Sequence, residues 1–240
     1  MKLAKYLANL GYGSRRDAMA LVAAGRVTDE AGNRVEEGAA FAHDSLRIDN
    51  EPLDPAPGAV MMLHKPVGYT CSTTDPGATI YELVPARFPH RRPLVAPIGR
   101  LDRDSSGLLL LTDDGALLHR ITAPRSHLPK VYEVTLAQPL RGDEADVFIA
   151  GTLVLKSDTS PLAPAMLHVL EPHKVRLTVT EGRYHQIRRM FAAVGNRVTA
   201  LHRASVGGLA LGDLAVGKWR VLGRGDIDRI FQTDGVAGLT

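Results

Sequence analysis

Residues 99–115 read GRLDRDSSGLLLLTDDG, which places one carboxylate, Asp102, between two arginines and shortly before four consecutive leucines. A short apolar run bounded by turn residues is typical of a strand that is buried on both faces of a sheet. Ser105, Ser106 and Gly107 favour a tight turn into that strand, and such a turn would fix the direction of Asp102. We therefore expect Asp102 to lie at the rim of a rigid β core, as a reactive group would.

The length and composition predict a soluble protein with one large domain or two unequal ones, and we favour two. The 240 residues are 45% hydrophobic, which is enough to bury a sizeable core. The start of the chain lacks the apolar stretch of a signal peptide, and no uninterrupted run of about 18 apolar residues occurs. The single cysteine, Cys71, excludes an intramolecular disulfide and a multi-cysteine zinc site. We therefore expect a cytoplasmic protein that does not enter a membrane.

The start of the chain predicts two short helices. Apolar side chains recur at the spacing of one helical face from Leu3 to Leu10. Ser14 and Asp17 then have the form of a capping box, in which each side chain bonds the backbone N–H of the other residue. The glycines before Ser14 end the first helix, so the two helices form a hairpin.

Small β-hairpins and a domain boundary follow these helices. The Gly32-Asn33 turn and the alternating Leu46 and Ile48 predict the hairpins. Prolines and glycine then concentrate in residues 54–58, which read DPAPG and which we interpret as a linker. The expected order is a small domain, a linker, a large domain and a weakly specified tail, over residues 1–54, 55–59, 60–222 and 223–240.

The large domain alternates short strands with turns and a few helices. Candidate strands cover residues 131–136, 166–170 and 175–180, and candidate helices cover residues 143–150 and 183–194. Strands that are adjacent in sequence and joined by short turns favour a mixed, largely antiparallel sheet with helices packed on it. We therefore expect an α+β fold.

One stretch near the end of the large domain is strongly basic. Residues 183–203 contain five arginines, two histidines and no acidic residue. A solvated surface helix normally interleaves both signs of charge, whereas a run of one sign is typical of phosphate contacts. The formal net charge of +3 allows a polyanionic partner without requiring one. A nucleic-acid partner is therefore the preferred interpretation.

Three segments occur in a fixed order along the large domain. They are GRLD, KVY and EGRYHQIRRM, at residues 99–102, 130–132 and 181–190. Together they resemble the three motifs of RNA pseudouridine synthases, in particular of the RsuA branch, which acts on small-subunit ribosomal RNA. HKPVGY at residues 64–69 resembles the family's opening strand motif, for which we expect scaffold and site-wall roles. The resemblance implies isomerisation of a uridine of 16S ribosomal RNA to pseudouridine, without cofactor or metal.

The resemblance also implies catalytic roles for three residues. Asp102 is the essential carboxylate, Tyr132 stacks on the flipped-out uracil, and Arg188 forms an ion pair with Asp102. Sequence leaves open whether the carboxylate attacks the sugar or removes a ribose proton. A buried carboxylate needs a nearby cation to stay charged, which suits an arginine at that position. The simpler alternatives are a core tyrosine at 132 and a phosphate-binding or solvated arginine at 188.

RNA contacts are expected from both domains. GSRR and AGRV, at residues 13–16 and 24–27, resemble the matching segments of an S4 domain, a small RNA-binding module. Residues 1–54 are net acidic, with seven Lys or Arg against nine Asp or Glu, so an ordinary helical hairpin is the alternative. The expected contacts are Lys2, Lys5, Arg15, Arg16 and Arg26 in the small domain and Arg100, Arg125, Lys130, Arg183, His185, Arg189 and Arg203 in the large one.

Rival functions follow from the same residues. The partner is expected to be ribosomal RNA or a partly assembled small ribosomal subunit, bound by a monomer. A relative acting on 23S ribosomal RNA is the first alternative, and a non-catalytic RNA-binding assembly factor is the second. A metal-dependent nuclease is disfavoured, because the aspartates from Asp102 to Asp114 match no established metal-binding loop.

Overall fold

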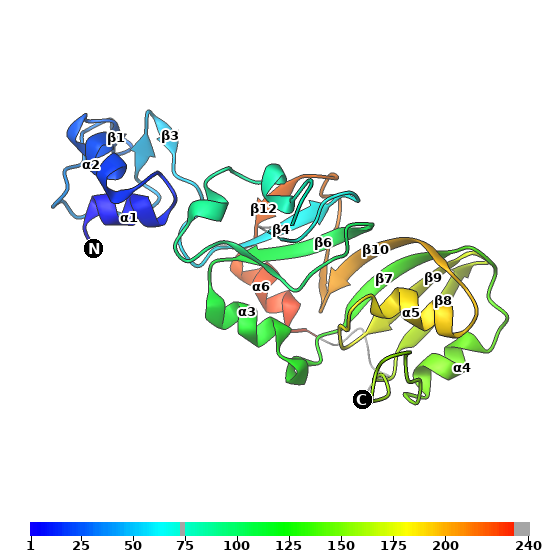
Figure 1. Ribbon diagram of the computed structural model, residues 1–240. Helices are drawn as coiled ribbons and strands as arrows, with labels where there is room; N and C mark the ends of the chain where they lie inside the picture. The colour runs from blue at the N-terminus through cyan, green and yellow to red at the C-terminus, as the bar shows by residue number, and fades with distance from the viewer. Residues whose placement is uncertain (73–74, 233–240) are drawn as a thin grey trace.

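The computed structural model describes residues 1–72 and 75–232. It contains a small N-terminal unit beside one end of a large sheet (Figure 1). The small unit has its own hydrophobic cluster, which includes Leu3, Leu7 and Leu46. Two further clusters lie on opposite faces of the large sheet, because alternate residues of its strands contribute to different clusters.

The small unit consists of two helices and a three-stranded sheet. Its elements are α1 (Leu3–Asn9), α2 (Arg15–Ala23), β1 (Val27–Thr28), β2 (Arg47–Ile48) and β3 (Glu51–Pro52). The capping box is present as predicted, with Ser14 N donating to Asp17 Oδ2 at 2.8 Å and Asp17 N to Ser14 Oγ at 3.2 Å. The first expected hairpin is reduced to one bridge between Thr28 and Arg34, and β1 pairs instead with β2.

The large sheet has nine strands. They are β4 (Val60–Lys65), β5 (Ala96–Ile98), β6 (Ser105–Thr112), β7 (Lys130–Leu136), β8 (Met166–Glu171), β9 (Lys174–Val179), β10 (Val198–Val206), β11 (Leu209–Ala210) and β12 (Trp219–Val221). The main order is β12-β4-β6-β10-β7-β9-β8, and among the described strands only β6 and β10 pair in parallel. The leucine run lies within β6 and is buried throughout, as predicted. The mixed, largely antiparallel sheet is thus confirmed.

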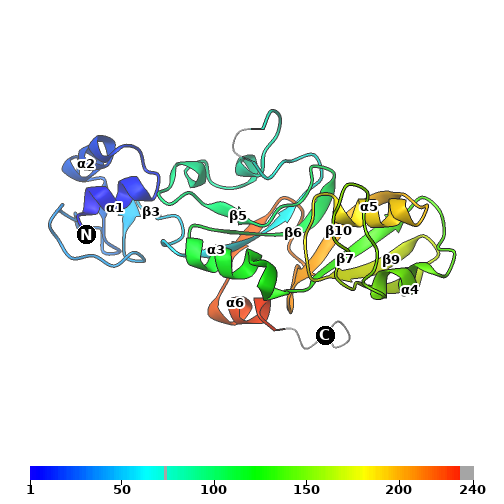
Figure 2. The same cartoon turned by 60° about the horizontal axis from the view of Figure 1, so that its bottom comes forward.

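Helices cover both faces of this sheet. They are α3 (Gly115–Thr122), α4 (Glu144–Ile149), α5 (Gln186–Ala193) and α6 (Arg224–Ile230), with short 3-10 turns at Ile80–Leu83, Phe88–His90 and Pro124–Ser126. α3 and α6 lie side by side in Figures 1 and 2, whereas α4 and α5 pack on the other cluster through Phe148 and Phe191. Within the described part of the chain, no helix is long and apolar enough to cross a bilayer.

The prediction of a weakly specified tail from residue 223 onward is wrong for residues 224–230. Residues 224–230 form α6, whose Ile230 is fully buried in the cluster beneath β11. The backbone N–H of Gly208 donates to Arg229 O at 2.9 Å. Gly207 (φ +56°) must be a glycine there, because a Cβ would lie 1.8 Å from Ile230 O. The remaining expected tail, residues 233–240, lies outside the described residues.

The small unit is attached to the large one by side-chain contacts as well as by the chain. Arg87 donates to Asp54 Oδ2 at 2.6 Å and lies 4.6 Å from the ring centre of Tyr12. Arg91 and Asp113 form a buried ion pair at 3.1 Å, and both also bond the backbone of the expected linker. These contacts hold the segment over residues 55–59 against the large domain.

Candidate active site

A pocket of about 600 Å³ lies at the point where the predicted motifs meet. Asp102 lines it from the turn before β6, Tyr132 from β7, and His185 from the residue before α5. Lys130 and Arg203 line the same pocket from β7 and β10. Segments that are far apart in sequence therefore meet around one carboxylate, whose side chain is 30% exposed.

Lys65 fixes the backbone that carries Asp102. This lysine is fully buried at the end of β4, and its Nζ donates to the carbonyl oxygens of Asp102 and Ser105 at 3.0 and 2.7 Å. It also donates to Pro66 O at 3.0 Å. Burial lowers the pKa of Lys65, and nearby acidic groups, including Asp102, raise it in part. Lys65 thus has the scaffold role expected for the segment at residues 64–69.

The prediction of an ion pair between Arg188 and Asp102 is wrong. Arg188 Nη2 lies 2.9 Å from Asp104 Oδ2 and also donates to Asp104 O at 3.2 Å. His185 occupies the place beside the candidate catalytic carboxylate, with Nε2 3.4 Å from Asp102 Oδ1. The predicted helix begins only at Gln186, because His185 has a left-handed backbone with φ 48°. Protonated His185, and not Arg188, would form the ion pair with Asp102.

Tyr132 belongs to both the core and the pocket. The residue is 8% exposed, is part of the cluster that also contains Ile187 and Leu201, and lines the pocket. Its neighbours across the sheet are Leu177 and Arg203. The packing holds the ring in place, and a base-stacking role stays a prediction.

Arg203 is a buried residue, although it was expected to contact RNA. It is 3% exposed, and its Nε donates to Leu108 O at 2.7 Å, which bridges β10 and β6. The two strands come close at Gly107 (φ +110°), where a Cβ would lie 2.3 Å from Arg203 O. Nearby Lys130 donates to Leu128 O at 2.9 Å. Burial, then Arg203, lowers the pKa of Lys130 to about 8, against an opposing effect of Glu181.

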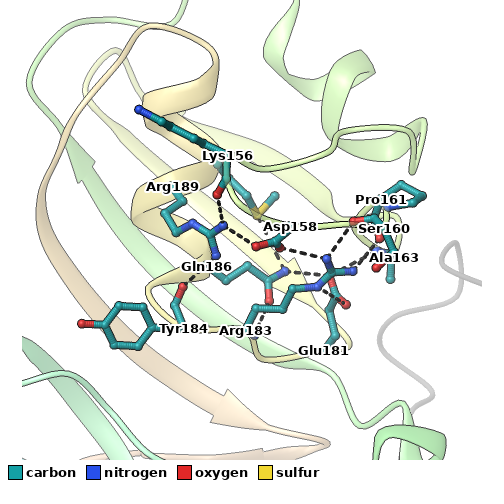
Figure 3. A network of polar contacts seen from close by, with 11 residues as sticks. Lys156, Asp158, Ser160, Pro161, Ala163, Glu181, Arg183, Tyr184, Gln186 and Arg189 are labelled. Atoms are coloured by element: carbon teal, nitrogen blue, oxygen red, sulfur yellow. Dashed lines mark hydrogen bonds and ion pairs between the residues drawn. The ribbon is translucent and has the colours of Figure 1, made fainter.

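Arg183 and Arg189 form ion pairs and hydrogen bonds with other residues of the protein, although both were also expected to contact RNA. Figure 3 shows that the two guanidinium groups converge on Asp158. Arg183 donates to Asp158 Oδ2 at 2.9 Å and to Ser160 O at 2.8 Å, and Arg189 bonds Asp158 Oδ1 and, at 2.6 Å, Lys156 O. Hydrogen bonds from Arg189 and then Arg183 hold the pKa of Asp158 below its ordinary value.

The other expected RNA contacts lie on the surface. Side chains of Lys2, Lys5, Arg15, Arg16, Arg100 and Arg125 are exposed. Arg26 is exposed too, but its guanidinium is paired with Asp49. Arg100 lines the pocket, whereas the four residues from Lys2 to Arg16 lie on or beside the two N-terminal helices. The surface therefore offers cations both beside the pocket and on the small unit.

With this fold and this pocket, the chain belongs to the RNA pseudouridylate synthase family, which it matches over residues 59–193. It is 44% identical over 227 residues to the ribosomal small subunit pseudouridine synthase A of Yersinia pestis, covering 92% of this chain and 94% of that one. The same enzyme of Escherichia coli K12 is 43% identical over 229 residues, with 92% and 96% covered.

A solved structure agrees with this assignment. A crystal structure of a pseudouridylate synthase is 35% identical and matches with a TM-score of 0.67, covering 96% of this chain and 99% of that chain. The enzyme class and the α+β fold expected from the sequence are thus confirmed.

Proposed function

We propose that this enzyme converts a uridine of 16S ribosomal RNA to pseudouridine. The observation that carries the proposal is the pocket that holds Asp102 beside Tyr132 and His185. The names and identities of the Yersinia and Escherichia relatives support the small ribosomal subunit as the substrate. We also propose that the protein acts as a cytoplasmic monomer.

The reaction breaks the bond between uracil N1 and ribose C1′ and forms one between C5 and C1′. N1 gains a proton and C5 loses one, so no oxidant or external energy source is needed. The target uridine must first leave its stack, and Tyr132 then provides an aromatic surface for the base. Asp102 acts in its ionised form, by attack on C1′ or by removal of a ribose proton. His185 Nε2 lies 3.4 Å from Asp102 Oδ1, and Lys65 holds the turn.

The small unit contributes RNA affinity as an S4-like domain. Lys2, Lys5, Arg15 and Arg16 are exposed and contact phosphates, and Arg100 and Arg125 are exposed cations of the large domain that contact others. The contacts of Arg87 with Asp54 and Tyr12 hold the small unit against the large one. This attachment sets the distance between the phosphate contacts and the pocket, which favours one particular uridine over others.

Mapping of pseudouridine tests this function. In cells that lack the protein, we expect one pseudouridine to disappear from 16S ribosomal RNA, and the wild-type gene to restore it. An Asp102→Asn gene should not restore it. Loss of a site in 23S ribosomal RNA would instead assign the enzyme to the large subunit, and no lost site at all would favour a binding role.

We expect Lys130 to make RNA affinity depend on pH. Its pKa of about 8 means that the ammonium is charged at pH 7 and largely neutral at pH 9. If Lys130 contacts a phosphate, the dissociation constant should rise between these values, and the salt slope of log K should shrink by about 0.7. Titrations at several salt concentrations measure both. Lys130→Arg should stay charged and remove the change, so equal pH dependence in wild type and variant would contradict the contact.

A further inference from the structure

Tyr184 is an exposed aromatic residue at the rim of the active-site pocket. The residue is 78% exposed, more than any other large hydrophobic residue in the described part of the chain. It lines the pocket next to His185, and the two rings are stacked with centroids 3.9 Å apart and planes at 15°. One face of the tyrosine is therefore covered by the residue beside Asp102, and the other faces solvent.

The backbone of Tyr184 is held by the network around Asp158. Arg189 Nη1 donates to Tyr184 O at 3.2 Å while its other nitrogen bonds Asp158 (Figure 3). On the other side of the tyrosine, Arg183 N donates to Gln186 Oε1 at 2.8 Å. Gln186 Nε2 in turn donates to Glu181 Oε1 at 3.1 Å. Residues 181–186 are thus a fixed loop, so the ring is presented before any ligand arrives.

The surroundings of this ring suit RNA. Arg100 and Arg103 are exposed and line the same pocket, and His185 lies directly behind the ring. An exposed aromatic face among cations is the arrangement on which bases of single-stranded RNA stack while phosphates contact the cations. The target uracil itself belongs deeper in the pocket, at Tyr132, which is 8% exposed.

We propose that Tyr184 stacks with the base next to the target uridine. The proposal rests on the proposed function and adds one nucleotide to its substrate site. When a uridine is flipped out, its neighbour loses a stacking partner, and an aromatic ring at the pocket rim replaces that partner. Because Tyr184 also stacks on His185, the neighbouring base would add a third ring to an existing stack of two.

Ring-removing and ring-retaining variants test the proposal. Tyr184→Ala should raise KM for the RNA roughly 5- to 150-fold, the range of one lost base–aromatic stack, and change kcat little. Tyr184→Phe should behave as wild type, because the stack needs only the ring. Val169→Ala is the matched control, since Val169 is 53% exposed on β8 and does not line the pocket. An unchanged KM for Tyr184→Ala would overturn the proposal.

A fluorescent base gives a readout that does not need turnover. Once the modified uridine is mapped, 2-aminopurine is placed on either side of it in an RNA fragment. Binding of wild type should quench the probe at one of the two positions, and Tyr184→Ala should not. Equal quenching by both proteins would overturn the proposal even if the enzyme is active. Absence of product from wild type on 16S ribosomal RNA would instead refute the proposed substrate, and the same pair of measurements is then made on the RNA that is modified.

Discussion

Asp102→Asn is expected to reduce the rate of pseudouridine formation to below roughly one hundredth of wild type. The asparagine has the same size, so Lys65 keeps its hydrogen bond to the backbone carbonyl of residue 102. Only the charge is lost, and with it the group that attacks the sugar or removes its proton. RNA affinity should be nearly unchanged, because a carboxylate does not attract phosphate.

Single-turnover assays with saturating enzyme measure the rate, and filter binding measures the affinity. Asp104→Asn is the matched control, since it removes the same charge two residues away, where the carboxylate pairs with Arg188. It should retain most of the activity. If Asp104→Asn is the inactive variant and Asp102→Asn is active, then the assignment of the catalytic carboxylate is wrong.

Local patterns predicted the scaffold of this site correctly. The leucine run became β6 because four apolar residues between turn residues leave few alternatives. α6 was missed, although Ile227, Ile230 and Phe231 recur at helical spacing and could have indicated it. The prediction of a tail relied too heavily on the position of these residues near the end of the chain.

Contacts between segments that are far apart in the chain could not be predicted from sequence patterns. The window over residues 183–203 contains no acid, but the fold brings Asp158 and Asp104 to three of its arginines. A count within a window therefore overstates the free positive charge of the surface. The partner of Arg188 was equally hidden, because Asp102 and Asp104 are two residues apart and spacing alone cannot choose between them. The burial of Lys65 is also a product of the fold.

Asp158 does not line the pocket, but it pairs with two arginines in or next to the loop that does. We therefore expect its removal to lower the activity strongly. Asp158→Ala removes the acceptor shared by Arg183 and Arg189, whose side chains are 25% and 26% exposed. The loop over residues 181–186 then loses two of the contacts that hold it, and we expect His185 to shift relative to Asp102. Because a shift of about 1 Å in a positioning group costs up to roughly 100-fold, kcat/KM should fall by a similar factor.

Conservative variants test whether Asp158 acts by positioning the loop. The pH dependence of unfolding tests how much its ionised carboxylate contributes to stability. Asp158→Glu should recover part of kcat/KM, and Asp143→Asn, at an exposed position before α4, should behave as wild type. The folded pKa of Asp158 is lowered, so its contribution to stability is present above the unfolded pKa of about 4 and is lost as pH falls through the folded pKa. Urea unfolding should therefore separate wild type from Asp158→Asn at pH 7 and bring them together in acid. A kcat/KM of Asp158→Ala within twofold of wild type would show that the loop keeps its position without this carboxylate.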